Sequence, residues 1–87
     1  MASYELVFRK SVAKDLRALP KQDVKRIMQR ICSLAEDPRP AGCERLSSQQ
    51  RYRVRQGVYR IIYEIKNGRL MVLVVKVGHR REVYRSS

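Results

Sequence analysis

The sequence predicts a single α+β domain with the element order β-α-α-β-β-β, in which two N-terminal helices pack on one face of an antiparallel sheet. Three observations support this fold class. Residues 51–77 contain three strand-like runs separated by turn signals, residues 11–36 contain two stretches of helical periodicity, and 87 residues are enough for one domain. A core of this size is marginal by itself, so a partner or a dimer could add stability.

The three predicted strands follow one another closely in the C-terminal half. We expect them at Tyr52–Arg55, Val58–Ile65 and Leu70–Val77. Gln56-Gly57 and Asn67-Gly68 lie between them, and a pair with glycine second is typical of a tight hairpin turn. Two such turns in succession predict a meander of antiparallel strands.

Alternation of side chains then divides this sheet into two faces. Two-residue turns place Arg53 opposite Arg60, and Arg60 opposite Val75. One face is the predicted core and carries Tyr52, Val54, Tyr59, Ile61, Tyr63, Ile65, Val72 and Val74. The other face, left uncovered by the helices, carries Arg53, Arg55, Arg60, Glu64, Met71, Leu73, Val75 and Val77, with His79 following on the same parity.

Several arginines therefore share one sheet face. Like charges directly opposite each other destabilise a sheet, so Arg53 against Arg60 is a local cost that a bound polyanion would offset. Alternatively, the long arginine side chains simply cover a solvated face. The convergence of these arginines with Arg80 in the tail favours an anion-binding surface.

The N-terminal half predicts one strand and two helices. Tyr4–Phe8 is rich in strand-forming residues, and Ser11 is the expected cap of a helix that ends at Leu19. Pro20 separates the helices, and the second helix spans Gln22–Glu36 with Asp23 near its N-terminus. The apolar stripes that should face the sheet are Val12, Leu16 and Leu19 in the first helix, and Val24, Ile27, Met28, Ile31 and Leu34 or Ala35 in the second.

A loop connects the helices to the strands. Asp37–Gly42 contains two prolines and a glycine, which predicts a connector without regular structure. Leu46 is the lone apolar residue before the hairpins, and we expect it to fill part of the core. Cys32 is expected to be a core residue and Cys43 a loop thiol, because their spacing matches no zinc or redox motif. With a single histidine and no clustered carboxylates, we expect neither a metal site nor a cofactor.

The charge is strongly positive and is unevenly distributed. Twenty Lys and Arg face eight Asp and Glu, for a formal net charge of +12. Residues 1–44 hold nine basic and six acidic residues, whereas residues 45–87 hold eleven basic and two acidic ones. Such a field indicates nucleic acid, an anionic membrane or an acidic protein as the partner. Because we identify neither a bilayer-spanning run nor a signal peptide, we expect a cytoplasmic protein that does not bind membranes.

With these residues in view, the chain resembles the RelE/ParE superfamily of type II toxin–antitoxin toxins along nearly its whole length. The first similar stretch is YELVFRKSVAKDLRALP at residues 4–20, and further matches are Asp37-Pro38, Arg45-Leu46 and RYRVR at residues 51–55. The most specific matches are GVYRIIY at residues 57–63 and VGHRREVY at residues 77–84. The resemblance implies a RelE-like, microbial ribonuclease-type fold.

The RelE branch implies a ribosome-dependent mRNA endonuclease that cuts the codon in the A site. In this chemistry, which uses no metal, the 2′-hydroxyl of one nucleotide attacks the adjacent phosphate and leaves 2′,3′-cyclic phosphate and 5′-hydroxyl ends. The reaction needs a base, cations around the phosphorane, an acid for the leaving oxygen and an in-line geometry.

The resemblance assigns roles to individual residues of this chain. Arg60 matches the arginine that stabilises the phosphate in the transition state, and Arg80 matches a later arginine near the leaving group. Tyr84 matches a C-terminal tyrosine that stacks on the nucleotide. Arg53 and Arg55 stand where the best-known relative has two lysines, and an arginine does not lose its proton as a lysine can.

The general base therefore has no obvious occupant. His79 has an unperturbed pKa near neutrality and is a candidate base or acid; Glu64 is a weaker one. Alternatively, His79 is a turn residue, Tyr84 packs the C-terminus, and the site works by charge and orientation alone. The residues expected to bind RNA or ribosomal RNA through backbone electrostatics are Arg45, Arg51, Arg81 and Arg85.

Three functions and a set of partners follow from the resemblance. The first function is the mRNA interferase, the second is inhibition of DNA gyrase as in the ParE branch, and the third is RNA binding without catalysis. The combination of Arg60, Arg80 and Tyr84 favours the first. The implied partners are a cognate RelB-like antitoxin, the 70S ribosome with its mRNA, and operator DNA only indirectly through the antitoxin.

Overall fold

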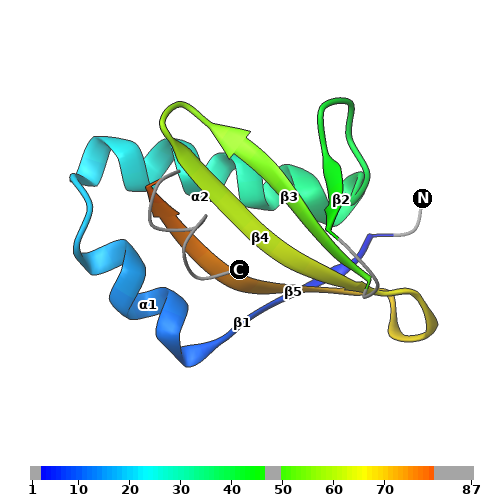
Figure 1. Ribbon diagram of the computed structural model, residues 1–87. Coiled ribbons are helices and arrows are strands. Elements are labelled where there is room, and N and C mark those ends of the chain that lie inside the picture. Colours follow the sequence, from blue (N-terminus) through cyan, green and yellow to red (C-terminus); the bar gives the residue numbers. More distant parts are fainter. Residues whose placement is uncertain (1–2, 47–49, 80–87) are drawn as a thin grey trace.

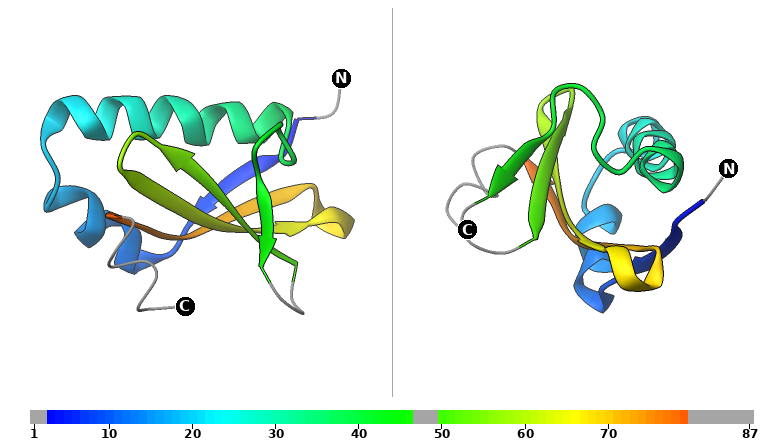
Figure 2. Two further views of the ribbon diagram at one scale, coloured as in Figure 1. Left: turned by 45° about the horizontal axis from the view of Figure 1, so that its top comes forward. Right: turned by 90° about the vertical axis from the view of Figure 1, so that its right-hand side faces the viewer.

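Two helices lie on one side of a five-stranded sheet, and no helix of the described residues covers the other side, which we call the open face (Figures 1 and 2). The computed structural model describes residues 3–46 and 50–79. Its elements are β1 (Glu5–Phe8), α1 (Lys10–Arg17), α2 (Lys21–Glu36), β2 (Glu44–Leu46), β3 (Arg51–Gln56), β4 (Tyr59–Lys66), a 3₁₀ turn (Asn67–Arg69) and β5 (Met71–His79). The predicted α+β class and element order are confirmed, with β2 as an additional short strand.

The sheet has the strand order β1-β5-β4-β3-β2. The pairs from β2 to β5 are antiparallel, as predicted, but β1 runs parallel to β5. The sheet is therefore mixed rather than wholly antiparallel. The polypeptide crosses from β1 to the other strands through both helices, which is the long connection that a parallel pair requires.

The helices begin close to the predicted positions. The N-cap of α1 is Arg9, not Ser11, and no side chain caps it. The backbone N–H of Arg9 donates to the carbonyl of Val74 at 3.0 Å, so α1 starts where pairing of the backbone with β5 ends. Pro20 is the N-cap of α2, and Asp23 lies in its first turn as predicted.

The core fills the space between the helices and the sheet. Its fully buried helix residues are Val12, Ile27, Ile31 and Leu34, and its buried sheet residues are Tyr52, Val54, Ile61, Tyr63, Ile65, Val72, Val74 and Val77. The predicted core face is thus confirmed and gains Val77. Two predictions about this core are wrong: Cys32 is exposed on α2, and Leu46 packs with Ile62 and Val75 on the opposite face of the sheet.

The turns differ from the predicted two-residue loops. The first loop is Gly57-Val58, with Gln56 paired to Tyr59, because the backbone needs a positive φ of 61° at the first loop position and glycine supplies it. The second loop contains the 3₁₀ turn and then Leu70, which lies in the left-handed region at a φ of 49°. Lys66 consequently pairs with Met71.

A β-bulge changes the register within the β4–β5 pair. Tyr63 pairs with Val74 but Ile62 pairs with Lys76, so Val75 is an extra residue on β5. Beyond the bulge every β5 side chain moves to the face opposite the predicted one. Val77 therefore enters the core, and Gly78 rather than Val75 lies opposite Arg60.

Two stacked tyrosines fasten the 37–43 connector to the sheet. The rings of Tyr52 and Tyr63 lie 5.9 Å apart, and the guanidinium of Arg39 lies 5.4 Å from the Tyr52 ring. The Tyr63 hydroxyl donates to the carbonyl of Pro38 at 2.6 Å. Burial raises the pKa of Tyr63, so this hydroxyl keeps its proton and remains a donor.

Replacement of Tyr63 with phenylalanine tests this attachment. The change leaves the buried carbonyl of Pro38 without its donor, so we expect Tyr63→Phe to lower the free energy of unfolding by about 1–2 kcal/mol in urea titrations. Tyr4→Phe is the control, because the Tyr4 hydroxyl makes a longer, exposed bond to Asn67. Equal losses in the two variants would contradict a special role for the buried bond.

Candidate nucleic-acid interface on the open sheet face

Among the described residues of β3 and β4, four arginines lie on the sheet face opposite the two helices. Arg51, Arg53 and Arg55 come from β3, and Arg60 comes from β4. Alternation along β3 gives its three arginines one side, opposite the buried Tyr52 and Val54. The register pairs Arg55 directly with Arg60, which therefore points to the same side. The predicted common face of Arg53, Arg55 and Arg60 is thus confirmed.

The partner across the strands differs from the predicted one. Arg53 lies opposite Ile62, and it is Arg55 that lies opposite Arg60, because the turn is displaced by one residue. Arg60 is 6% exposed, whereas Arg55 is exposed. Gly78 lies opposite Arg60 on β5, so no side chain from β5 stands at that position. Two like charges thus meet across the strands, an arrangement that an anion would stabilise.

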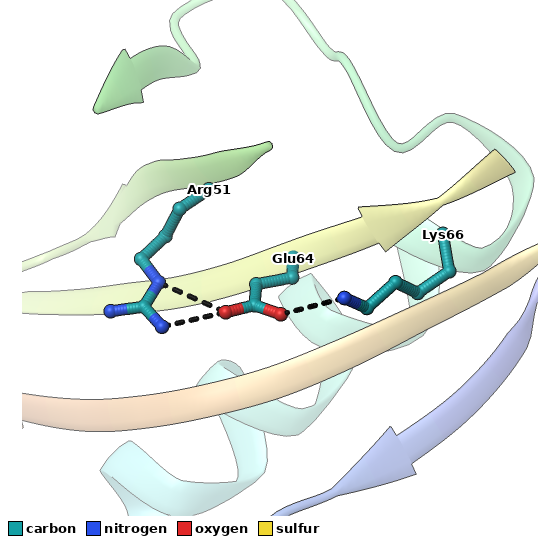
Figure 3. A network of polar contacts seen from close by, with 3 residues as sticks. All are labelled: Arg51, Glu64 and Lys66. Carbon is teal, nitrogen blue, oxygen red and sulfur yellow. Dashed lines mark hydrogen bonds and ion pairs between the residues drawn. The ribbon is translucent and has the colours of Figure 1, made fainter. Parts of the chain in front are cut away.

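Ion pairs hold the arginines at the other end of β3. Arg51 donates from Nε and Nη2 to the same carboxylate oxygen of Glu64, at 3.1 and 2.6 Å, and Lys66 Nζ lies 3.2 Å from the other oxygen (Figure 3). Burial opposes ionisation of Glu64, but the hydrogen bonds from Arg51 and Lys66 outweigh it, so the pKa of this carboxyl lies below its usual range. A carboxylate held in this way is a weak proton acceptor.

Arg53 is held from the neighbouring strand. Its guanidinium pairs with the carboxylate of Glu44 on β2, and only 13% of the Arg53 side chain is exposed. This contact does not follow from the sequence prediction, which has no strand at the position of β2. The three residues of β2 are too few to show a clear alternation, so the only available signal was the position of Glu44 shortly before the hairpins.

His79 lies on the opposite side of the sheet from the arginines. It pairs with Tyr59, and the two rings meet edge to face with centroids 6.3 Å apart. The residue lines a cleft of about 510 Å³ beside the end of α1, together with Asp15 and Leu19. The predicted position of His79 on the arginine face is wrong, because the bulge at Val75 reverses the side-chain direction after it.

The remaining predicted residues divide into two groups. Arg45 pairs with Tyr52, so it points to the helix side and away from the four arginines. Arg80, Arg81, Tyr84 and Arg85 lie outside the described residues. Within residues 3–46 and 50–79, no group of three or more His, Cys, Asp or Glu side chains could hold a metal ion, and no helix has the length and apolar character to cross a membrane.

The pH dependence of stability tests the ion pairs of Glu64. Because its pKa is lowered in the folded state, its contribution is complete above the unfolded pKa and is lost as the pH falls through the folded value. We expect Glu64→Gln to lower the free energy of unfolding by about 1 kcal/mol near neutral pH, and by progressively less below about pH 4. Glu36→Gln, on an exposed carboxylate, is the control. A difference from wild type that stays constant with pH would refute this coupling.

The sequence matches a known toxin family over most of its length. The family model described as the ParE toxin of the type II toxin–antitoxin system parDE matches residues 6–84. No curated protein is significantly similar in sequence.

Solved toxin structures have the same fold. The archaeal RelE–RelB complex from Pyrococcus horikoshii OT3 aligns with a TM-score of 0.81 and 27% identity, over 90% of this chain and 96% of the other. A mutant of the E. coli toxin RelE in complex with a peptide of its antitoxin aligns with a TM-score of 0.78 and 26% identity, over 99% of this chain and 94% of the other. The RelBE2 toxin–antitoxin complex of Mycobacterium tuberculosis aligns with a TM-score of 0.79 and 23% identity, over 90% of this chain and 99% of the other. Because the family match covers most of the sequence, the chain belongs to the ParE toxin family of type II toxin–antitoxin systems, within the RelE/ParE superfamily.

Proposed function

We propose that this toxin is a ribosome-dependent mRNA endoribonuclease that cuts the A-site codon by attack of a ribose 2′-hydroxyl on the adjacent phosphate. The observation that carries the proposal is the cross-strand pair of Arg55 and Arg60 on the open sheet face. A toxin of this superfamily has to present its chemistry to a large partner, and the two described helices both lie on the other side of the sheet from this face. Two adjacent guanidinium groups there suit a phosphate group better than any neutral ligand.

The arginines would stabilise the negative charge of the reacting phosphate and would not transfer protons. In the phosphorane formed by 2′-hydroxyl attack, negative charge collects on the non-bridging oxygens. Arg60 is positioned by its strand and is almost completely buried, so its charge acts in an environment that screens poorly and needs little reorganisation. Arg55 is exposed and would bind the phosphate as it arrives. No metal is required for this form of stabilisation.

The described part of the open face offers no strong general base beside Arg60. An arginine stays protonated, Glu64 is held by Arg51 and Lys66, and His79 lies on the other side of the sheet. We therefore propose that orientation and charge dominate the reaction and that the ribosome holds the mRNA for in-line attack. Arg80 at the leaving group and Tyr84 stacked on a base complete the proposed site. This proposal also predicts that naked RNA is cut poorly.

A cognate antitoxin is the second proposed partner. The solved relatives include complexes of a RelE toxin with a RelB antitoxin. A chain with a net charge of +12 also favours an acidic polypeptide that screens its field. We propose that a RelB-like antitoxin encoded beside the toxin wraps this chain and blocks its action.

Cleavage on programmed ribosomes tests the enzymatic proposal. Purified toxin is added to 70S ribosomes with a defined A-site codon, and the RNA ends are mapped. We expect a ribosome-dependent cut within the codon, with 2′,3′-cyclic phosphate and 5′-hydroxyl ends, without added metal beyond that needed by the ribosome. Folded, toxic protein that leaves the codon intact would refute the proposal.

Substitutions at the arginine pair give the second prediction. We expect Arg60→Ala to reduce the single-turnover cleavage rate by roughly 10²–10³-fold, the cost of removing one preorganised donor to a developing anion. Arg55→Ala should reduce the same cleavage rate by about tenfold, because the Arg55 side chain is exposed and shares the stabilisation of the phosphate with Arg60. Lys25→Ala, which removes one exposed charge on α2, is the matched control. Thermal unfolding shows whether Arg60→Ala keeps the fold. Arg60→Lys keeps a positive charge at this position and removes only the guanidinium.

The family match favours one further candidate function. The matching model is that of a ParE toxin, and the resemblance implies that this branch poisons DNA gyrase without RNA chemistry. A gyrase supercoiling assay distinguishes the two candidates. Inhibition of supercoiling by wild-type protein, combined with intact mRNA on ribosomes, would assign the chain to that function.

A further inference from the structure

A groove at the far end of the open face has the chemistry of a peptide-binding site. It lies beside the β4–β5 loop, has a volume of about 650 Å³, and has Val7, Met71 and Leu73 as its apolar residues. Val7 pairs with Leu73 across β1 and β5, so these side chains come from adjacent strands. Lys66 and Arg69 supply the positive charges of the lining. We propose that this groove anchors an amphipathic, acidic segment of the cognate antitoxin.

The groove is preformed because its loop is closed by a bond of its own and is tied to the start of β1 by two others. The Tyr4 hydroxyl donates to Asn67 Oδ1 at 3.3 Å, and the N–H of Leu70 donates to the Asn67 carbonyl at 3.2 Å. The N–H of Glu5 donates to the carbonyl of Leu70 at 2.7 Å. A partner that binds a held loop loses less conformational entropy than one that has to order it.

The positive charge at the groove is only partly balanced. Lys66 shares Glu64 with Arg51 (Figure 3). Arg69 is exposed and has no hydrogen-bonding or ion-pair partner among the residues that the structure describes. Carboxylates on the antitoxin segment would therefore find an available cation beside the apolar residues. Such pairs at the rim of an interface contribute specificity and a faster association rate.

The lining favours a peptide over RNA. The apolar residues are aliphatic, and a single-stranded base is normally held by stacking on an aromatic ring or an arginine plane. Methionine adapts its shape to a partner side chain and is frequent at peptide-binding surfaces. At the same end of the molecule, Leu70 is 45% exposed and adopts a left-handed conformation that is costly for a bulky residue. Leu70 lies between the lining residues Arg69 and Met71 in the sequence, so it adds exposed aliphatic area beside the groove.

The position of the groove gives it a distinct place in inhibition. Lys66 and Arg60 are six residues apart on β4, which corresponds to about 20 Å along the strand. An antitoxin segment bound in the groove would thus hold the inhibitor on the face that carries the arginines without occupying them. A second segment over Arg55 and Arg60 would then bind at a raised effective concentration. The inference rests on the proposed antitoxin partnership and is independent of the ribonuclease proposal.

Charge substitutions in the groove test the inference. The probe is the purified protein encoded next to the toxin gene, and its affinity is measured by isothermal titration calorimetry for the full-length toxin. We expect Met71→Glu to weaken binding by about 10- to 100-fold and Arg69→Glu by about tenfold, with a steeper loss at low salt. Val58→Glu is the matched control, because Val58 is 53% exposed in the other hairpin loop. Met71→Ala and thermal unfolding show whether the fold is retained.

The possible results distinguish failure of the groove as a binding site from failure of the antitoxin partnership. Weakened binding in the two groove variants, with Val58→Glu unchanged, supports the inference. Unchanged affinity in folded Met71→Glu and Arg69→Glu overturns it while leaving the partnership intact. Absence of binding by every form, wild type included, contradicts the partnership itself. If both variants instead lose only ribosome binding in sedimentation assays, the groove contacts RNA and the inference is wrong.

Discussion

The extra residue at Val75 is the constraint on which the C-terminal half of the sheet depends. Without it, the side chain of Val77 would lie on the open face and the core beside α1 would lack a residue. With it, Val77 is buried, and its N–H donates to Asp15 on α1 at 3.3 Å. The same shift turns His79 toward Tyr59 and leaves a glycine, Gly78, opposite Arg60. One inserted residue thus places Val77 in the core on one face and a residue without a side chain opposite Arg60 on the other.

The arginines of the open face differ in how their charges are used. At the start of β3, Glu64 and Glu44 hold Arg51 and Arg53, so these two guanidinium groups are oriented by carboxylates from neighbouring strands. At the end of β3, Arg55 faces Arg60 and no carboxylate side chain lies opposite either of them in the register. The two ends of β3 therefore differ in their cross-strand neighbours: carboxylates orient Arg51 and Arg53, whereas Arg55 lies beside a second arginine.

Much of the fold followed from the sequence because its signals were periodic. Alternation in β3 and β4 placed the arginines on one face and the tyrosines on the other, and it survived a one-residue error in the turn because both strands kept their parity. The bulge had no such signal: residues 72–75 are all aliphatic, so a slip by one residue exposes no polar group. This is why His79 was assigned to the wrong face. Cys32 was misplaced for another reason, since a cysteine next to the buried Ile31 lies off the apolar stripe.

The open sheet face combines apolar residues with arginines, and this bears on how two partners could use it. Ile62 and Val75 form a second apolar cluster there, flanked by Leu46 and Leu73, on the side away from the helices. Ile62 and Val75 are already buried, so the apolar area that a partner could still cover on this face is that of the half-buried Leu46 and Leu73. The two proposed partners need the same face for different reasons, the ribosome for its charge and the antitoxin for its apolar groove. In the proposed arrangement the anchor of the antitoxin at the apolar end is separate from the proposed phosphate site, and only the second segment competes with RNA for Arg55 and Arg60.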